Sequence, residues 1–511
     1  MEVRCLPLSF YSLLASDIRG PNQQLFLPVF SPFPSAPLFF SQRTLSHPYD
    51  LEEPTLLPIA SAPSPDGEDE DGANASASAS AAPSPKFAHV ATSCSACHTI
   101  ALTTDGIAYG WGRNEANQLG LATGPCPSVG RPVPLSGPWG DVALVGAACG
   151  KSHSVLVDAG GRAYSVGSNV RGQCGINSSQ DHVPRWRKCS VPAGGGGDGA
   201  DAGGERGDGP ARIVRAACGE EFTVLLSSGG GLYTAGSAEF GQLGNGATGE
   251  HIVAAGKIGF ANATKFERRS VFVQTELDAG GRTDFSSSTQ GSEKIKYSTL
   301  PRSAHIAIAS VSCGRNHAVA VEAPARSGAP PRVFTWGCGS YGCLGHGIQA
   351  DEHRPRLVSS LRGPLFASNL PRTAAAGSTC TMVLTAQGHA YYFGKHRMVG
   401  EATMRPALIE QLANNAHVVT ALSAGGATVF LTTKNAVTVS WGVGQTGELG
   451  YGRGNQKSSS QPKFVERLDS VLVTSVACGY GHTVFLVRDD DADDAKALGK
   501  MAKLSEDEWA P

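Results

Sequence analysis

Short runs of alternating apolar and polar residues recur along most of this chain, and glycine-rich turns separate them. A typical run is SVLV at 154–157, and steps such as Asp105-Gly106 and Gly160-Gly161 accompany these runs. Alternation of apolar and polar residues with a period of two indicates β-strands. Glycine as the second residue of each of these dipeptides supplies the positive φ of a tight hairpin turn. From residue 87 to residue 488 the pattern therefore predicts many short strands joined by tight turns.

Two phrases alternate through this region. The first is a small residue, Cys-Gly, two variable residues and His, followed by apolar residues. It occurs as AACGKSHSVLV (147–157), VSCGRNHAVAV (311–321) and VACGYGHTVFL (476–486), and as AACGEEFTVLL (216–226) with Phe in place of His. The second is an aromatic strand that runs into a Gly-x-x-Gly turn, as in YGWGRNEANQLG (109–120) and FTWGCGSYGCLG (334–345). Six copies of the second phrase are found against seven of the first.

The cysteine position of the first phrase marks each repeat, at 94, 149, 218, 313, 376, 424 and 478. A base spacing of about 50 residues with four short strands is typical of a propeller blade rather than of a helical solenoid. Seven marks predict an all-β fold, a seven-bladed β-propeller on residues 87–488. Long gaps between marks predict insertions at 190–210 and 247–305, and FERRSVFVQTELD (266–278) predicts a strand pair outside its blade.

The two ends of the chain differ in composition from the repeats. Residues 1–86 are rich in Pro, Ser and Ala, include DGEDEDG at 66–72, and hold four basic against ten acidic residues. Such a segment cannot bury enough apolar area to offset its ordering entropy, so we expect a disordered acidic tail. Residues 489–511 begin with an acidic run and predict a short helical tail. The net charge of −2 supplies no global positive field for nucleic-acid binding.

Cysteine usage and hydropathy restrict the compartment. The 13 cysteines are odd in number and several stand at the repeat marks, which indicates small buried side chains in a reducing compartment. Four prolines interrupt the apolar stretch at 25–40, so it cannot form a membrane helix. We expect a monomer of the nucleus, the cytoplasm or both, which is not secreted and does not bind membranes.

Two motifs that suggest cofactors are better explained by the repeats. CSACH (94–98) has the spacing of a c-type haem attachment site, but its Cys and His stand in the register of the other repeats. One Cys–His pair for each blade is spread round a ring and cannot supply four ligands to one ion. No phosphate-binding loop and no nucleophile–base arrangement is found. We expect no cofactor, no metal and no covalent catalysis, and a histidine ring that bonds backbone across its own turn.

The sequence motifs of these repeats resemble those of the regulator of chromosome condensation repeat family. The resemblance covers residues 90–488 and is carried by SWGVGQTGELGYG (440–452), WGRNEANQLG (111–120) and CGSYGCLGHG (338–347). It implies a propeller that interacts with a small GTPase, in some members as a guanine-nucleotide exchange factor. It also implies association with chromatin, kinetochores or microtubules in mitosis. The acidic tail departs from the Lys/Arg-rich tail of the family, which argues against binding of chromatin or microtubules by the tail.

The two residues between Gly and His of the first phrase vary while the frame around them stays fixed. These loops converge on one rim of a propeller, and variation on a repeated scaffold is typical of a binding surface. The resemblance implies that acidic and histidine residues of such loops act in nucleotide exchange. The candidate partner-binding residues are Lys151, Glu220, Glu221, Arg315, Asn316, His317 and Tyr480. We expect them to bind a small GTPase of the Rac, Arf, Ral or Ran type; the alternative is a non-catalytic scaffold on chromatin or microtubules.

How the ring closes is open. The strands that should pair with the last repeat are expected before residue 93, yet residues 60–92 contain no aromatic-glycine phrase. Either residues 1–86 are not the native start of the chain, or the ring closes with an irregular strand. We favour the first, since an open propeller would expose sheet edges.

Overall fold

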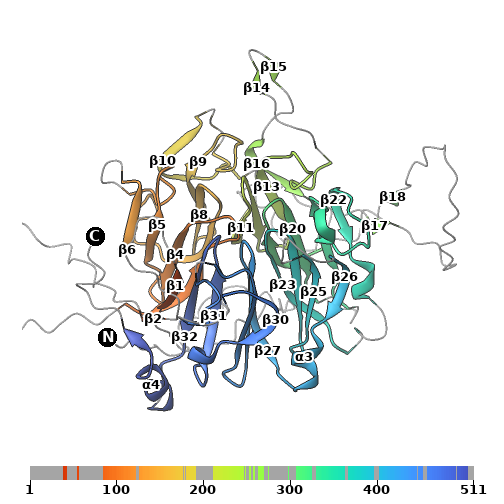
Figure 1. Ribbon diagram of the computed structural model, residues 1–511. Coiled ribbons are helices and arrows are strands. Elements are labelled where there is room, and N and C mark those ends of the chain that lie inside the picture. Colours follow the sequence, from red (N-terminus) through yellow and green to blue (C-terminus); the bar gives the residue numbers. More distant parts are fainter. Residues whose placement is uncertain are drawn as a thin grey trace, which may run out of the picture.

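The computed structural model describes residues 85–191, 211–246 and 306–503, residue 248, and isolated strands at 38–42, 55–56 and between 253 and 298. Positions left out within the three long ranges are 122–125, 177, 179, 325–329, 363–365, 367, 396–401, 446, 453–456 and 491. The described chain forms a ring of antiparallel sheets, which follow one another in chain order from orange to blue in Figure 1.

Six of these sheets are four-stranded blades. The first three consist of β3 (Phe87–Ala91), β4 (His98–Thr103), β5 (Ala108–Arg113) and β6 (Ser128–Pro134); β7 (Leu144–Cys149), β8 (His153–Asp158), β9 (Ala163–Ser168) and β10 (His182–Lys188); and β11 (Ile213–Cys218), β12 (Phe222–Ser227), β13 (Leu232–Gly236) and β16 (Ala263–Arg269). The other three consist of β19 (Ile308–Cys313), β20 (His317–Glu322), β21 (Val333–Gly337) and β22 (Glu352–Leu357); β23 (Pro371–Ala376), β24 (Cys380–Thr385), β25 (Ala390–Gly394) and β26 (Thr403–Leu408); and β27 (Val419–Ala424), β28 (Thr428–Thr433), β29 (Thr438–Gly442) and β30 (Ser459–Phe464).

The first strand of each blade lies toward the centre of the ring. First strands of neighbouring blades contact one another, as β7 does β11 and β19 does β23. The second strand lies between two neighbouring blades, and in β8 and β28 every residue is buried. A strand covered on both faces needs apolar or hydrogen-bonded side chains at every position. This explains why HSVLVD and TVFLTT do not alternate as strands with one solvated face do.

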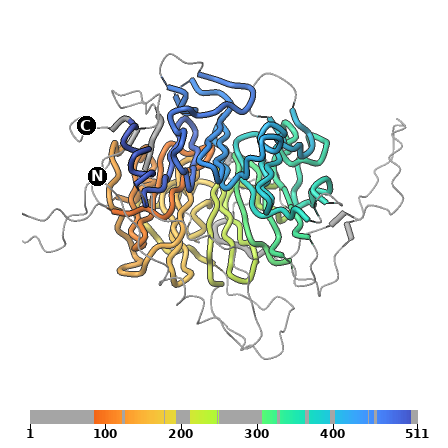
Figure 2. The backbone as a smooth tube through the Cα atoms, turned by 90° about the horizontal axis from the view of Figure 1, so that it is seen from below, coloured from red at the N-terminus to blue at the C-terminus, as the bar shows by residue number. Residues whose placement is uncertain are grey.

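The seventh sheet is built differently. Its five strands follow the order β31-β32-β1-β2-β33. The last repeat supplies β31 (Val473–Cys478) and β32 (His482–Val487), residues far earlier in the chain supply β1 (Leu38–Gln42) and β2 (Thr55–Leu56), and the C-terminal region supplies β33 (Ala502–Lys503). Strand β1 pairs antiparallel with β32, and β2 pairs parallel with β33. The blue strands of this closing sheet lie beside the orange first blade in both views (Figures 1 and 2).

The prediction of seven blades is therefore wrong, because the structure has six blades of the predicted four-stranded kind. The repeat marked by Cys478 has no aromatic-glycine strand of its own, and β1 takes the place beside β32 that such a strand would occupy. The six aromatic-glycine phrases, which form β5, β9, β13, β21, β25 and β29, give the correct number. The ring closes with an irregular strand, the alternative that we did not favour.

The tail predicted at 1–86 and the insertion predicted at 190–210 fall mostly outside the described residues and stay predictions. In the second insertion, β16 pairs with β13 as the outer strand of its blade. The strand pair that we predicted outside the blade is thus wrong in its first half. Two-stranded sheets formed by β14 (Val253–Ala254) with β15 (Lys257–Ile258), and by β17 (Gln274–Thr275) with β18 (Tyr297–Ser298), make up the rest of the described insertion.

Outer strands carry features that hinder pairing with other chains. Each pairing of an outer strand with its neighbour contains a register shift. Proline stands in five of these strands, at Pro132 and Pro134 in the first and at Pro184, Pro355, Pro406 and Pro462 in the others. A missing N–H donor and a bulge both disfavour edge-to-edge association.

Helical segments are few in the described chain. They are α3 (Glu410–Asn414), α4 (Ala492–Leu498) and the 3-10 turns η1 (Ser340–Gly342), η2 (Ser359–Leu361) and η3 (Glu466–Leu468). Helix α4 lies within the C-terminal tail, where the sequence predicted a helical segment. None of the helices in the described ranges is long and apolar enough to cross a membrane.

Candidate functional site

The loop between the first and second strand of each sheet carries the variable residues, and we call the surface formed by these seven loops the inner-loop surface. Successive strands are antiparallel, so these loops all lie on one face of the ring. Its central positions are Ala96 and Cys97, Lys151 and Ser152, Glu220 and Glu221, Arg315 and Asn316, Ser378 and Thr379, Gly426 and Ala427, and Tyr480 and Gly481.

Backbone hydrogen bonds join these loops to one another. The amide of Lys151 donates to the carbonyl of Glu220 (3.2 Å), and the amide of Glu220 donates to that of Arg315 (2.9 Å). Farther round the ring, Ser378 donates to Gly425, Gly426 to Gly479, and Tyr480 to Ala96, at 2.9 to 3.2 Å. The predicted variable positions therefore form two hydrogen-bonded groups on this surface, one from Lys151 to Arg315 and the other from Ser378 through Tyr480 to Ala96.

The glycine of the Cys-Gly-x-x-His phrase is required by the histidine that follows it. A Cβ atom added to Gly150 would lie 2.1 Å from the ring of His153, and one added to Gly314 or Gly479 would lie 2.2 Å from the ring of His317 or His482. No side chain can occupy that space while the ring is in place. The repeated Gly–His pair is thus a packing unit that fixes the shape of the loop.

Each ring bonds to a hydroxyl group on the next sheet. The Nε2–Oγ distances are 2.7 Å for His98 with Ser154, and 2.9 Å for His153 with Thr223, His317 with Thr381 and His482 with Thr99. Three of these hydroxyls, on Ser154, Thr223 and Thr381, donate their own hydrogen to a backbone carbonyl at 2.7 to 2.8 Å. Nε2 must then be the donor to them, which fixes the neutral tautomer. Our expectation that the rings bond backbone across their own turns is wrong, because these contacts join neighbouring sheets.

Burial keeps these imidazoles neutral. It lowers the pKa of His98 and His153 to about 3, and that of His317 and His482 to about 4. Burial in an apolar environment disfavours the charged form of histidine. His317, which the sequence suggested as a partner contact, is 1% exposed. It positions the loop that carries Arg315 and Asn316 and is not on the inner-loop surface.

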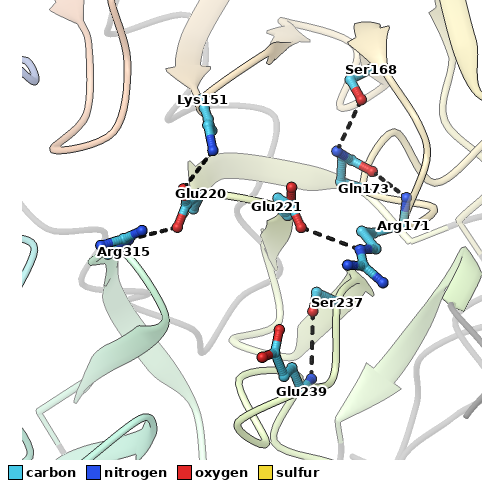
Figure 3. A network of polar contacts seen from close by, with 9 residues as sticks. All are labelled: Lys151, Ser168, Arg171, Gln173, Glu220, Glu221, Ser237, Glu239 and Arg315. Atoms are coloured by element: carbon cyan, nitrogen blue, oxygen red, sulfur yellow. Dashed lines mark hydrogen bonds and ion pairs between the residues drawn. The ribbon is translucent and has the colours of Figure 1, made fainter. Parts of the chain in front are cut away.

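Charged side chains occupy one part of the inner-loop surface (Figure 3). Glu220 accepts from Lys151 Nζ at 2.8 Å and from Arg315 Nε at 2.6 Å, and so links loops from three adjacent blades. Burial alone would raise the pKa of the Glu220 carboxyl, but hydrogen bonds from Arg315 and Lys151 outweigh it and lower that pKa. The side chains of Lys151 and Arg315 remain about half exposed and are accessible to a partner.

Glu221 faces away from this cluster and pairs with Arg171 at 3.3 Å. Arg171 lies in the loop between β9 and β10, where its amide is held by the side chain of Gln173 at 2.9 Å. Sequence reasoning missed Arg171, because the phrase that contains it is a turn motif whose variable positions carry no signal of their own. Its place opposite Glu221 depends on how two blades pack.

The remaining loops of the inner-loop surface carry no charged side chain at their central positions. They present Ser378, Gly426 and Ala96, together with Tyr480. Tyr480 is 65% exposed, more than any other large apolar side chain among the described residues. The surface thus divides into a charged part on three blades and a part made of small residues and one exposed aromatic ring.

Features of a metal or haem site are not found in the described part of the chain. It contains no group of three or more His, Cys, Asp or Glu placed to hold an ion. In the CSACH segment, Cys94 is buried and the Nε2 atom of His98 is occupied by Ser154. Buried thiols at Cys94, Cys218 and Cys478 have pKa values raised to about 11, 12 and 12 by burial, so they are held in the unreactive form.

Comparison with known proteins places this architecture in a family. The family model described as the RCC1-like domain matches residues 67–485. Protein RCC2 of Homo sapiens is 30% identical over 417 residues, which cover 81% of this chain and 70% of that protein. Human WBSCR16 has a similar solved structure, with a TM-score of 0.58 and 19% identity, covering 89% of this chain and 99% of the other.

A second solved structure is that of Prp20p from Saccharomyces cerevisiae, which was described with its binding properties to Gsp1p and histones. It has a TM-score of 0.59 and 16% identity, covering 91% of this chain and 94% of the other. At this identity the likeness concerns the fold alone. The repeat phrases, the ring of sheets and the match of the family model over most of the chain together show that this protein belongs to the RCC1-like domain family.

Proposed function

We propose that this protein binds a small GTPase through the inner-loop surface and accelerates the release of its guanine nucleotide, in mitosis or in chromosome or cytoskeletal regulation. Family membership supports the proposal, as does the binding of Gsp1p described for Prp20p. Exchange by this route is differential binding, because the factor must prefer the nucleotide-free partner. It requires no cofactor and no covalent step.

The observation that carries the proposal is the division of the inner-loop surface. Interfaces between proteins commonly combine exposed aromatic anchors with charged groups that set orientation and association rate. Tyr480 supplies an exposed aromatic ring, and Lys151 and Arg315 supply exposed cations. All three belong to loops whose backbones are fixed by hydrogen bonds to their neighbours. A rigid surface with this composition suits a partner that carries both an apolar patch and acidic groups.

The test is release of fluorescent mant-GDP from Rac-, Arf-, Ral- and Ran-type GTPases in the presence of the full chain. We expect acceleration with one type, and loss of it in Glu220→Ala/Glu221→Ala. The matched control is Glu410→Ala/Glu466→Ala, which removes two exposed carboxylates that lie away from the inner-loop surface. No acceleration by the folded chain at saturating concentration excludes exchange. Equal loss in both double variants excludes a specific role for this surface.

One observation favours the second candidate function, a non-catalytic scaffold on chromatin or microtubules. Strand β10 presents Arg185, Arg187 and Lys188 as exposed cations along the outer edge of its blade. Both nucleosomes and microtubules are strongly acidic, and histone binding was described for Prp20p. The test is salt-dependent pelleting with each partner, using Arg185→Gln/Arg187→Gln/Lys188→Gln. If β10 makes these contacts, the variant lowers the salt slope for nucleosomes by about three. An unchanged slope contradicts this role for β10.

A further inference from the structure

A cavity of about 420 Å³ lies on the face of the ring opposite the inner-loop surface. Its walls come from the turn between β28 and β29, from the segment that precedes β31, and from the chain that follows β32, including α4. The cavity therefore lies at the seam between the last regular blade and the closing sheet. Nothing in the proposed function uses it.

The cavity arises where a repeated contact between sheets is lost. At four other seams, a glycine lies in the turn between the second and third strands of one blade. Its carbonyl accepts a hydrogen bond from the backbone amide at the start of the first strand of the following blade. The donor and acceptor pairs, at 2.9 to 3.0 Å, are Leu144 and Gly106, Ile213 and Gly161, Ile308 and Gly230, and Val419 and Gly388. A Cβ atom at any of these glycines would lie 2.2 to 2.6 Å from the next sheet.

At the cavity the equivalent turn residue is Ala436, which has a φ of +58°. No hydrogen bond of this kind joins Ala436 to Val473 in the described part of the chain. The methyl group of Ala436 stands at the turn position where glycine carries no side chain at the other four seams. Ser470, at +65°, is a second non-glycine residue with positive φ that lines the cavity. Strained backbone of this kind is common at binding sites.

Cations from three separate elements converge on this space. Lys434 comes from the turn, Arg488 from the end of β32, and Lys496 and Lys500 from α4 and the residues after it. Arg488 is neutralised by Asp494, which is 6% exposed and accepts from it at 2.7 and 3.1 Å. None of the three lysines forms an ion pair with another described residue. With Asp493 as the other carboxylate of the lining, four cations and two anions leave a net charge of +2.

We propose that this cavity binds a phosphate monoester group. A dianion matches the net charge of the lining, and three lysines supply ammonium donors to its oxygens. The volume falls within the range of small-molecule sites, about 300–1,000 Å³, and leaves room for the group that carries the phosphate. That group is either a small phosphorylated metabolite or a phosphorylated side chain of a partner protein, and both present the same dianion.

The test is isothermal titration of the full chain at low ionic strength with phenyl phosphate and with an acetylated, amidated Gly-phosphoserine-Gly peptide. Hydroxyl peptide and sulfate serve as ligand controls. We expect saturable binding of at least one phosphate ester, with no heat from the hydroxyl peptide. Tighter binding of phenyl phosphate indicates a small metabolite, and tighter binding of the phosphopeptide indicates a protein partner.

The variant that decides is Lys434→Gln/Lys496→Gln, with Arg354→Gln at an exposed cation of the distant strand β22 as the control. Loss of a charged hydrogen bond weakens binding about tenfold or more. We therefore expect at least that loss in the double variant and no change in the control. Binding that is equal in both variants, equally strong for sulfate, or absent below about 10 mM ester overturns the proposal. Because the double variant removes only exposed charge, an unchanged circular dichroism spectrum confirms that it folds.

Discussion

Acidification should unfold this protein well above the range in which carboxylates titrate. His98, His153, His317 and His482 are neutral and buried, with pKa values of about 3 or 4 against about 6.5 in the unfolded chain. Because the folded pKa is the lower one, the unfolded state binds protons first as the pH falls. The stability from the neutral rings is fully present above about pH 7 and is lost progressively toward pH 4.

The size of the effect follows from the shift. At pH 5, a histidine with an unfolded pKa of 6.5 and a folded pKa of about 3 or 4 destabilises the folded state by about 2 kcal/mol. Four such rings sum to about 8 kcal/mol, which is comparable to the whole stability of many domains. We expect the urea midpoint, followed by tryptophan fluorescence, to fall steeply between pH 6.5 and pH 5.

The variant His153→Gln separates this cause from general acid unfolding. Glutamine keeps an N–H donor for Thr223 but binds no proton, so its stability deficit relative to the native chain should shrink by about 2 kcal/mol from pH 7.5 to pH 5. The matched control is His182→Gln, the same substitution at an exposed histidine of β10. Parallel loss of stability in the native chain and His153→Gln over this range would refute the reasoning.

Three further predictions concern the frame of the ring. Gly314→Ala places a Cβ atom 2.2 Å from the ring of His317 and should lower the free energy of unfolding by about 2–3 kcal/mol. Gly146→Ala, whose Cβ atom would lie 3.5 Å from its nearest neighbour, should lower it by less than about 1 kcal/mol. Similar losses in both variants would contradict the packing role of the Gly–His pair. Ala436→Gly relieves a positive φ and should raise the urea midpoint by an amount equivalent to about 0.5–1 kcal/mol, and a fall instead would show that the methyl group stabilises the seam. Deleting residues 1–57 removes β1 and β2, and it should lower the thermal midpoint and promote aggregation through the exposed edge of β32. Deleting residues 1–30, which leaves β1 and β2 in place, should have neither effect. Equal midpoints for the two deletions would show that β1 does not close the ring.

The sequence predicted the repeat and the face on which the variable loops lie. It did so because the Cys-Gly-x-x-His phrase reports a local requirement, the space that a histidine ring takes above a glycine. The same phrase led to the wrong number of blades, since its seventh copy starts a sheet that the repeats do not complete. The partner of β32 is β1, which lies more than 400 residues away in the chain and has no repeat phrase to identify it.

Contacts between blades could not be predicted from the repeats alone. The sequence indicated Glu220 and Lys151 as separate candidates, but their ion pair depends on the rotation of one blade relative to the next. The same holds for Arg171, whose loop carries no phrase that distinguishes it from the turns of other blades. Local periodicity identifies strands, whereas the twist between sheets decides which exposed side chains meet.

In each loop, the buried residues that fix the loop shape are different from the exposed residues that a partner can contact. This difference makes the nucleotide-release experiment interpretable. Buried residues such as Gly314 and His317 determine the loop shape, and the exposed cations beside Glu220 can be rehydrated when that carboxylate is removed. Surface ion pairs contribute about 1 kcal/mol or less each to stability, and the cations of these three pairs are a quarter to a half exposed or more, so Glu220→Ala/Glu221→Ala should fold with only a modestly lower urea midpoint. A loss of nucleotide release in that variant then reports on the partner interface. If the midpoint falls by far more than the loss of three surface ion pairs explains, Glu220 has a structural role, and the binding surface must be sought at Tyr480 and the uncharged loops instead.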